Sequence, residues 1–158
     1  VDSTDGVVFV PALTGLGAPH WDPHARGLII GVTRGTNRAH IVRATLEAIA
    51  FEVRDVLETM PGLSSLRVDG GASANDLLCQ VQADQIGVPV DRPKLVETTA
   101  LGAAFLAGVG CGRWTQDEVR RLWREGARYE PAMSEDERAS RHAEWTRAVE
   151  RACGWASG

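Results

Sequence analysis

Several features that mark large classes of proteins are missing from this sequence. No apolar run approaches the roughly 20 residues that a membrane-spanning helix needs, and no apolar leader follows a group of positive charges. The formal net charge is −4, and the lysines and arginines form no cluster on one predicted face. We therefore expect a cytoplasmic protein whose partners include neither nucleic acid nor a membrane.

Motifs for metal and phosphate binding are also scarce. The chain has three cysteines, an odd number, and none forms a CxxC pair, so we expect free thiols and neither a disulfide framework nor a metal site. No GxxxxGK[ST] or GxGxxG motif occurs. A Walker-type phosphate cradle is thus excluded, and a dinucleotide-binding fold is unsupported.

What is present suits a globular domain. With 158 residues, 44% of them hydrophobic, the chain is long enough for one compact core. It begins at Val1 without a methionine and enters an apolar segment within six residues. We expect it to be part of a longer protein.

The first part of the chain predicts two strands and a long helix. Apolar, β-branched residues over 7–10 and 28–32 indicate buried strands, and the glycine- and proline-rich segment between them predicts a loop. Thr36 or Asn37 can cap the helix that follows, because its side chain can accept a backbone N–H. Apolar residues then recur every three or four positions until Pro61 ends the pattern.

The middle of the chain alternates strands and helices. The predicted elements are a strand over 66–69, a helix that ends at Ile86, a strand over 88–90 and a helix over 100–109. Ser73 with Asp76 resembles a capping pair for the first of these helices, and Gly87 supplies its C-terminal stop. Because strands joined through helices run the same way, parallel pairing and an α/β fold are predicted.

Beyond Gly112 the composition becomes more charged. Two capping boxes, Thr115 with Glu118 and Ser134 with Glu137, predict helices that carry tryptophans. We expect these tryptophans to be buried against the sheet. The simplest division is one domain over 1–112 and a helical tail over 113–158 packed on the same domain.

A glycine turn is the best candidate for ligand binding. Gly70 and Gly71 link a predicted strand to a helix, and glycines there let a ligand touch the backbone. The helix start offers unsatisfied N–H groups, and Asn75 adds a directional amide. Asp69 is expected to orient the turn by accepting nearby N–H groups. Taken alone, the turn is more often a purely structural connection with a satisfied cap than a ligand site.

Longer motifs give the turn a context. The loop over 11–23, Pro-Ala-Leu-Thr-Gly-Leu-Gly-Ala-Pro-His-Trp-Asp-Pro, closely resembles the corresponding loop of glycerol kinases within the FGGY family of carbohydrate kinases. Residues 25–47 resemble the carboxyl-terminal signature of that family. The resemblance continues through 67–72, 99–104 and into the tail, so it covers essentially the whole chain.

The resemblance implies a two-domain enzyme with the actin-like ATPase (ribonuclease H-like) fold. Such an enzyme transfers phosphate from ATP, with Mg2+, to a terminal hydroxyl of glycerol, and it is expected to be a homo-oligomer. This chain resembles the later part of the second domain. By motif position, Gly71 and Asn75 resemble the family's contacts to ATP or ADP, while Gly70 and Ala72 shape the same turn.

No catalytic residue transfers to this chain. The family's catalytic base is an aspartate in a Gly-Asp-Gln motif, and that motif does not occur here. We therefore expect the isolated chain to be inactive. Two alternatives remain: an FGGY kinase acting on xylulose or gluconate, which the residues over 14–19 disfavour, and a non-catalytic nucleotide-binding module.

Overall fold

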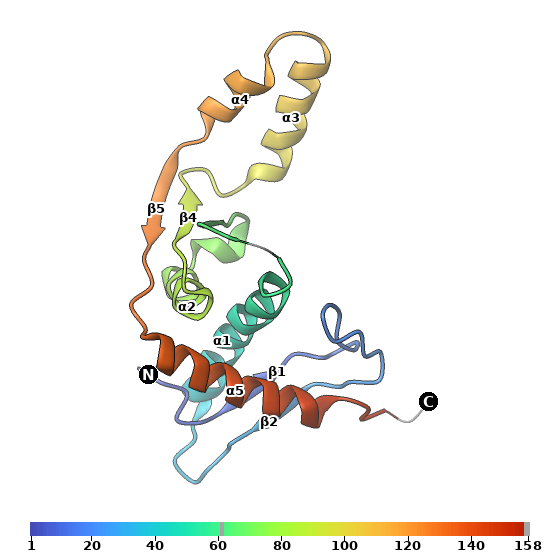
Figure 1. The fold of residues 1–158 in the computed structure, drawn as a ribbon, viewed down its shortest axis with the longest axis vertical. Helices are drawn as coiled ribbons and strands as arrows, with labels where there is room; N and C mark the ends of the chain where they lie inside the picture. Colours follow the sequence, from blue (N-terminus) through green and yellow to red (C-terminus); the bar gives the residue numbers. More distant parts are fainter. Residues whose placement is uncertain (61, 157–158) are drawn as a thin grey trace.

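The computed structural model describes residues 1–60 and 62–156. Two helices, α1 (Arg38–Leu57) and α5 (Glu135–Ala152), cross over a ribbon of two strands, β1 (Val8–Val10) and β2 (Leu28–Ile30) (Figure 1). A second sheet lies beyond α1, and two further helices extend from it as an arm (Figure 1). The molecule is therefore elongated. Its largest apolar cluster lies where α1 and α5 pack on the ribbon, at the end of the molecule opposite the arm.

The ribbon confirms the two predicted N-terminal strands. Val8 pairs with Ile30 and Val10 with Leu28 in antiparallel register. Val10 is fully buried and joins a cluster in which the Phe51 and Trp145 rings stack with centroids 5.3 Å apart. Burial of these apolar side chains is what holds α1 and α5 on the ribbon.

Helix α1 begins as its sequence predicts. The Asn37 side chain accepts a hydrogen bond from the Ala39 N–H at 2.9 Å, and the Asn37 N–H donates to His40 Nδ1 at 3.1 Å. These bonds satisfy donors that a helix start otherwise leaves open. The helix ends at Leu57, and the predicted terminator Pro61 lies outside the described residues.

The second sheet has three strands, β3 (Leu66–Arg67), β4 (Val90–Pro93) and β5 (Glu125–Tyr129), in the order β3-β4-β5. Pairing of β3 with β4 is parallel, as predicted. β5 pairs antiparallel with β4 and was not predicted. Its five residues, Glu-Gly-Ala-Arg-Tyr, include two charged side chains and none that is buried, so they lack the apolar alternation that indicates a strand.

Three shorter helices complete the fold. Helix α2 (Asp76–Ile86) ends at Gly87, whose φ of 70° confirms the predicted left-handed stop. Helices α3 (Thr98–Gly110) and α4 (Gln116–Leu122) form the arm (Figure 1). Thr115 caps α4 by accepting from the Glu118 N–H, and Ser134 caps α5 by accepting from the Glu137 N–H, as predicted.

The tail differs from prediction in two respects. It contributes the strand β5 to the sheet as well as helices, and its tryptophans are not equally buried. Trp145 is 1% exposed but Trp155 is 73% exposed; Trp114 packs edge-on against Phe105, and Trp123 lies beneath the Arg67 guanidinium. The division at 112/113 remains a prediction, and residues 157–158 of the tail lie outside the described part.

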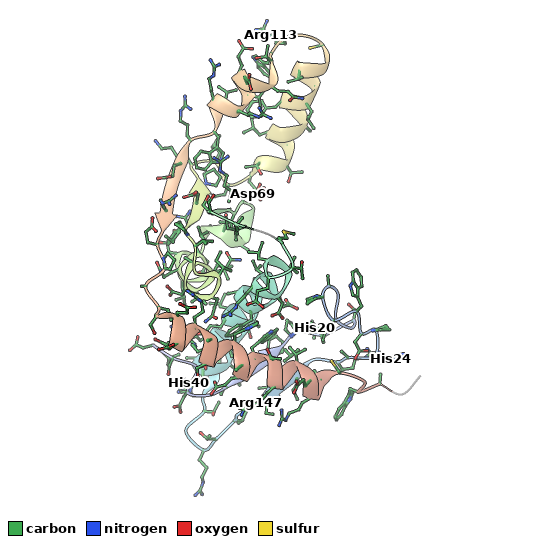
Figure 2. The ribbon with its side chains drawn as sticks, in the orientation of Figure 1. His20, His24, His40, Asp69, Arg113 and Arg147 are labelled. Atoms are coloured by element: carbon green, nitrogen blue, oxygen red, sulfur yellow. The ribbon has the colours of Figure 1, made fainter. Side chains whose placement is uncertain are left out.

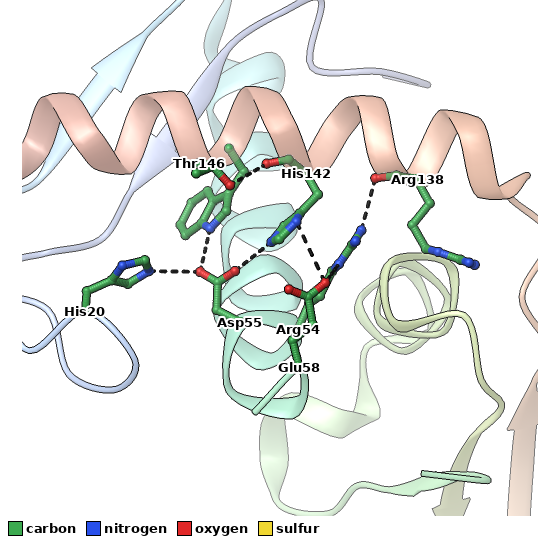
Figure 3. A network of polar contacts seen from close by, with 8 residues as sticks. His20, Arg54, Asp55, Glu58, Arg138, His142 and Thr146 are labelled. Atoms are coloured by element: carbon green, nitrogen blue, oxygen red, sulfur yellow. Dashed lines mark hydrogen bonds and ion pairs between the residues drawn. The ribbon is translucent and has the colours of Figure 1, made fainter. Parts of the chain in front are cut away.

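A carboxylate network fastens α5 to α1 and to the loop after β1 (Figure 3). Asp55 accepts hydrogen bonds from His142 Nε2 at 2.7 Å, Trp145 Nε1 at 2.8 Å and His20 Nε2 at 3.2 Å. Burial opposes ionisation of Asp55, but the bonds from His142, Trp145 and His20 outweigh it, so the pKa of Asp55 lies below its usual value.

Glu47 forms a second link between the same helices. Its side chain is almost completely buried, and it accepts from Arg43 Nε at 2.8 Å and from Arg141 Nη2 at 2.6 Å. A buried carboxylate needs such pairing.

Within the described residues, no helix combines the length and the apolar character needed to cross a bilayer.

Candidate functional site

The predicted glycine turn lies where β3 ends, next to Asp69 in Figure 2. Gly70 has a φ of 80°, a conformation that favours glycine, and a 3-10 helix, η1 (Gly71–Ala74), follows it. Gly71, Ala72 and Asn75 are exposed. The four predicted site residues therefore share one accessible turn.

The inner face of this turn is held by hydrogen bonds. The Gly70 N–H donates to the Val96 carbonyl at 2.7 Å, and the Ser73 hydroxyl donates to the Gly70 carbonyl at 2.7 Å. Ser73 was predicted to cap α2 together with Asp76. That prediction is wrong, because Ser73 is buried inside η1 and its hydroxyl closes the turn instead.

Asn75 is the residue that caps α2. Its Oδ1 accepts from the Leu78 N–H at 3.1 Å, which is the usual function of an asparagine at a helix start. Its side-chain NH2 group has no acceptor among the described residues. Asn75 is thus fixed by one end of its amide and presents the other end, a donor, to solvent.

Residues from the sheet support the turn from behind. Arg92 Nη1 on β4 donates to the Ser73 carbonyl and to Asp76 Oδ1, both at 2.8 Å. The Tyr129 hydroxyl on β5 donates to the same carboxylate oxygen at 2.6 Å. Sequence reasoning did not identify Arg92 or Tyr129, since Arg92 reaches the turn through the pairing of β4 with β3, and Tyr129 through the pairing of β5 with β4.

The pKa values in this cluster reflect that pairing. Hydrogen bonds from Tyr129 and Arg92 lower the pKa of Asp76, and burial together with the bond to Asp76 raises the pKa of Tyr129 to about 12. Asp76 is therefore ionised and Tyr129 protonated at neutral pH. The cluster is a fixed ion pair with one neutral donor.

The outer face of the turn determines which ligand suits it. A Cβ atom built on Gly71 would meet no atom within 4 Å, so the space in front of it is open. The Asn75 amide and the start of η1 offer donors there. Both groups are donors, so the outer face suits a ligand with hydrogen-bond acceptors, such as the ring nitrogens or hydroxyls of a nucleoside.

Asp69 does not act as expected. Its carboxylate makes no hydrogen bond within the described part of the chain, and Ser73 orients the turn instead. Across residues 1–60 and 62–156, no three histidine, cysteine or acidic side chains are grouped closely enough to hold a metal ion. The three cysteines are free thiols, as predicted.

Comparison with known proteins places the chain among sugar kinases. Residues 1–111 match the C-terminal domain of the FGGY family of carbohydrate kinases. The chain is 58% identical to a glycerol kinase of Dechloromonas aromatica (strain RCB), over 99% of this chain and 32% of that protein. It spans about a third of the length of the curated relatives that it matches.

Solved structures agree with this placement. A Plasmodium falciparum glycerol kinase with ADP has a TM-score of 0.85 at 39% identity, over 96% of this chain and 32% of that one. A gluconate kinase from Lactobacillus acidophilus has a TM-score of 0.74 at 26% identity, over 94% and 31%. These similarities confirm the α/β fold of the actin-like ATPase class that was expected from the sequence.

Proposed function

The chain belongs to the FGGY family of carbohydrate kinases, and on this basis we propose that the protein containing it phosphorylates glycerol with ATP to give glycerol 3-phosphate. The observation that carries the proposal is the exposed, donor-bearing turn over 70–75 in a chain 58% identical to a glycerol kinase. This chain supplies one side of the nucleotide-binding site.

We assign the adenosine end of the nucleotide to this turn. Gly71 lets the nucleoside approach the backbone, and the Asn75 NH2 group donates a hydrogen bond to a ring nitrogen or hydroxyl. Gly70 and Ala72 give the turn its shape. Support comes from the open space at Gly71 and from the fixed Asn75 amide.

Phosphoryl transfer depends mainly on positioning and on neutralising the charge of the transferring group, which Mg2+ does in kinases. The family's catalytic base lies in a Gly-Asp-Gln motif that does not occur in this chain, so we propose that the base and Mg2+ are held by other parts of the intact protein. The part of the reaction assigned to this chain is binding and orienting the nucleotide.

Substrate preference tests the proposal directly. The full-length protein is expected to phosphorylate glycerol with a kcat/KM at least about 100-fold above those for xylulose and gluconate, since a site built for one polyol rejects others through unpaired polar groups. A coupled assay of ADP release measures this. A preference for either sugar substrate would instead favour the alternative FGGY activity.

Absence of all three activities would favour a non-catalytic module, provided that ADP still binds in calorimetric titration.

We further propose that the protein works in the cytoplasm as a homo-oligomer. The cytoplasm keeps free cysteines reduced, and the three thiols here are unpaired. Light scattering on the full-length protein tests the oligomeric state.

A further inference from the structure

We propose that Arg92 is a positioning residue for nucleotide binding: from β4 it holds the two segments that flank Asn75 and so fixes the turn that meets the nucleotide. The inference rests on the proposed function. It adds a residue that lies outside the glycine motif and that acts through Ser73 and Asp76.

The geometry is a two-point clamp. One nitrogen, Arg92 Nη1, reaches the Ser73 carbonyl in η1 and the Asp76 carboxylate in α2, each at 2.8 Å. These acceptors lie two residues before and one residue after Asn75. Rotation of the Asn75 backbone would pull at least one acceptor away from the guanidinium, so the clamp restrains the direction in which the Asn75 amide points.

Exposure places Arg92 and its Ser73 acceptor on the inner side of the turn. The Arg92 side chain is 18% exposed and Ser73 is buried, whereas Gly71, Ala72 and Asn75 face solvent. The nucleotide-facing and Arg92-facing sides of the turn therefore differ. Arg92 acts by holding the backbone rather than by occupying the ligand's place.

A second strand reinforces the clamp. The Tyr129 hydroxyl donates to Asp76, and the Arg92 guanidinium lies 5.5 Å from the centroid of the Tyr129 ring. Charge-assisted bonds of this kind are about twice as strong as neutral ones. β5 thereby connects the tail of the chain to the turn, although it contributes no residue to the exposed face.

The glycines of the turn leave backbone freedom, and the bonds from Ser73 and to Val96 restrain it only at Gly70. Gly70 and Gly71 have no side chains, and glycine has more backbone freedom than any other residue. Without Arg92, the Ser73 carbonyl still accepts from the Cys79 thiol at 3.2 Å, and Asn75 still caps α2. We expect the turn to keep its fold and to lose its single preferred orientation.

The test uses the full-length protein with Arg92→Gln and Arg92→Lys. For Arg92→Gln, the KM for ATP and the Kd for ADP are expected to rise about 10-fold, the effect of losing hydrogen bonds to a charged group. The kcat at saturating ATP and the KM for glycerol stay within about twofold, because the bound state recovers the orientation. Lysine reaches one acceptor and restores part of the affinity.

Arg128→Gln on the neighbouring strand is the matched control. Arg128 pairs with Asp91 and Glu130 at 2.7 Å and does not touch the turn, so its KM for ATP should not change. Asp76→Asn, at a mostly exposed position, removes the charge of the second acceptor with little risk to folding. We expect its KM for ATP to rise about threefold.

Three outcomes would overturn the inference. The first is an unchanged KM for ATP in Arg92→Gln with only a lower melting temperature, which would show a purely structural role. The second is an equal rise in Arg128→Gln. The third is a wild-type protein that neither binds ADP nor phosphorylates any substrate, and this outcome, unlike the first two, would also remove the proposed function.

Discussion

At the scale of single residues, the effect of an acidic side chain depends on the donors around it. Asp55 accepts hydrogen bonds from the ring nitrogens of His142 and Trp145. Asp76 accepts from the Arg92 guanidinium and the Tyr129 hydroxyl. Asp55 is largely buried and joins α1, α5 and a loop, while Asp76 is mostly exposed and joins a turn to a sheet. The first arrangement bears on stability and the second on the site.

Asp55→Asn should make stability less dependent on acid. The folded-state pKa of Asp55 lies below its usual value, so its contribution is present above the unfolded value of about 3.9 and is lost as pH falls through the folded pKa. At neutral pH we expect the variant to lose about 2 kcal/mol of unfolding free energy. Urea unfolding of the full-length protein between about pH 6 and about pH 3 measures both effects.

Asp2→Asn is a suitable control because Asp2 is exposed and makes no hydrogen bond within the described residues. Its unfolding free energy should follow the wild-type pH profile. If Asp55→Asn kept the wild-type slope below about pH 4, the network in Figure 3 would not be responsible for acid sensitivity.

The two glycines of the turn should respond differently to alanine. Gly70 has a φ of 80° and a ψ of 170°, a backbone region that is essentially restricted to glycine, so Gly70→Ala introduces about 1–3 kcal/mol of backbone strain. Gly71 has ordinary φ and open space around it, so Gly71→Ala should leave the melting temperature unchanged while its methyl group obstructs the nucleotide. Calorimetry with ADP and thermal melting of the full-length protein separate the two; reduced ADP affinity without destabilisation in Gly71→Ala is the decisive result.

At the scale of elements, α3 is held to its neighbour by a small residue. Gly108 is buried directly beneath the Trp114 ring, and a Cβ atom built there would overlap the ring carbons. Phe105 meets the same ring edge-on with centroids 5.7 Å apart. Close approach of α3 to the segment before α4 therefore requires a glycine at this position.

Gly108→Ala is expected to destabilise the protein by about 1–3 kcal/mol, because the tryptophan must move. Gly102→Ala in the same helix is the control: nothing lies within 4 Å of its Cβ position, and alanine favours a helix over glycine by about 1 kcal/mol. Denaturant unfolding of the two full-length variants measures the difference. Equal stability of the two would show that Trp114 does not pack on α3 in solution.

At the scale of the whole molecule, the arm exposes much apolar surface. Leu106 is 74% exposed and Leu95 is 66% exposed, and a cavity of about 600 Å³ between α3 and α4 is lined by apolar side chains including Phe105 and Trp123. β3 is also an edge strand of its sheet. Open edges and large apolar patches promote association.

The isolated 158-residue chain is therefore expected to self-associate. We also expect it to show no kinase activity, because it lacks the Gly-Asp-Gln motif of the family's catalytic base. Sedimentation velocity over a roughly tenfold range of protein concentration should show species larger than the monomer. A monomeric sample that melts in one cooperative transition would contradict this expectation. Leu106→Ser, at the most exposed leucine of α3, should reduce the association.

The sequence by itself determined the features that depend on local chemistry. Hydrogen bonding and backbone freedom within a few residues determine where helices begin and end. Examples are helix α1 with its Asn37 cap, the Thr115 and Ser134 caps and the Gly87 stop. The family motifs likewise located the glycine turn. That Gly71 and Asn75 contact the nucleotide remains a prediction.

Only the tertiary structure decided which distant residues meet. β5 lacks a clear strand pattern because none of its residues is buried, and its pairing with β4 is what brings Tyr129 to Asp76 beside Arg92. Similarly, Asp55 finds its donors on α5, far away in the chain. Such contacts arise from packing between elements, whereas a sequence pattern reports only on neighbours within one element.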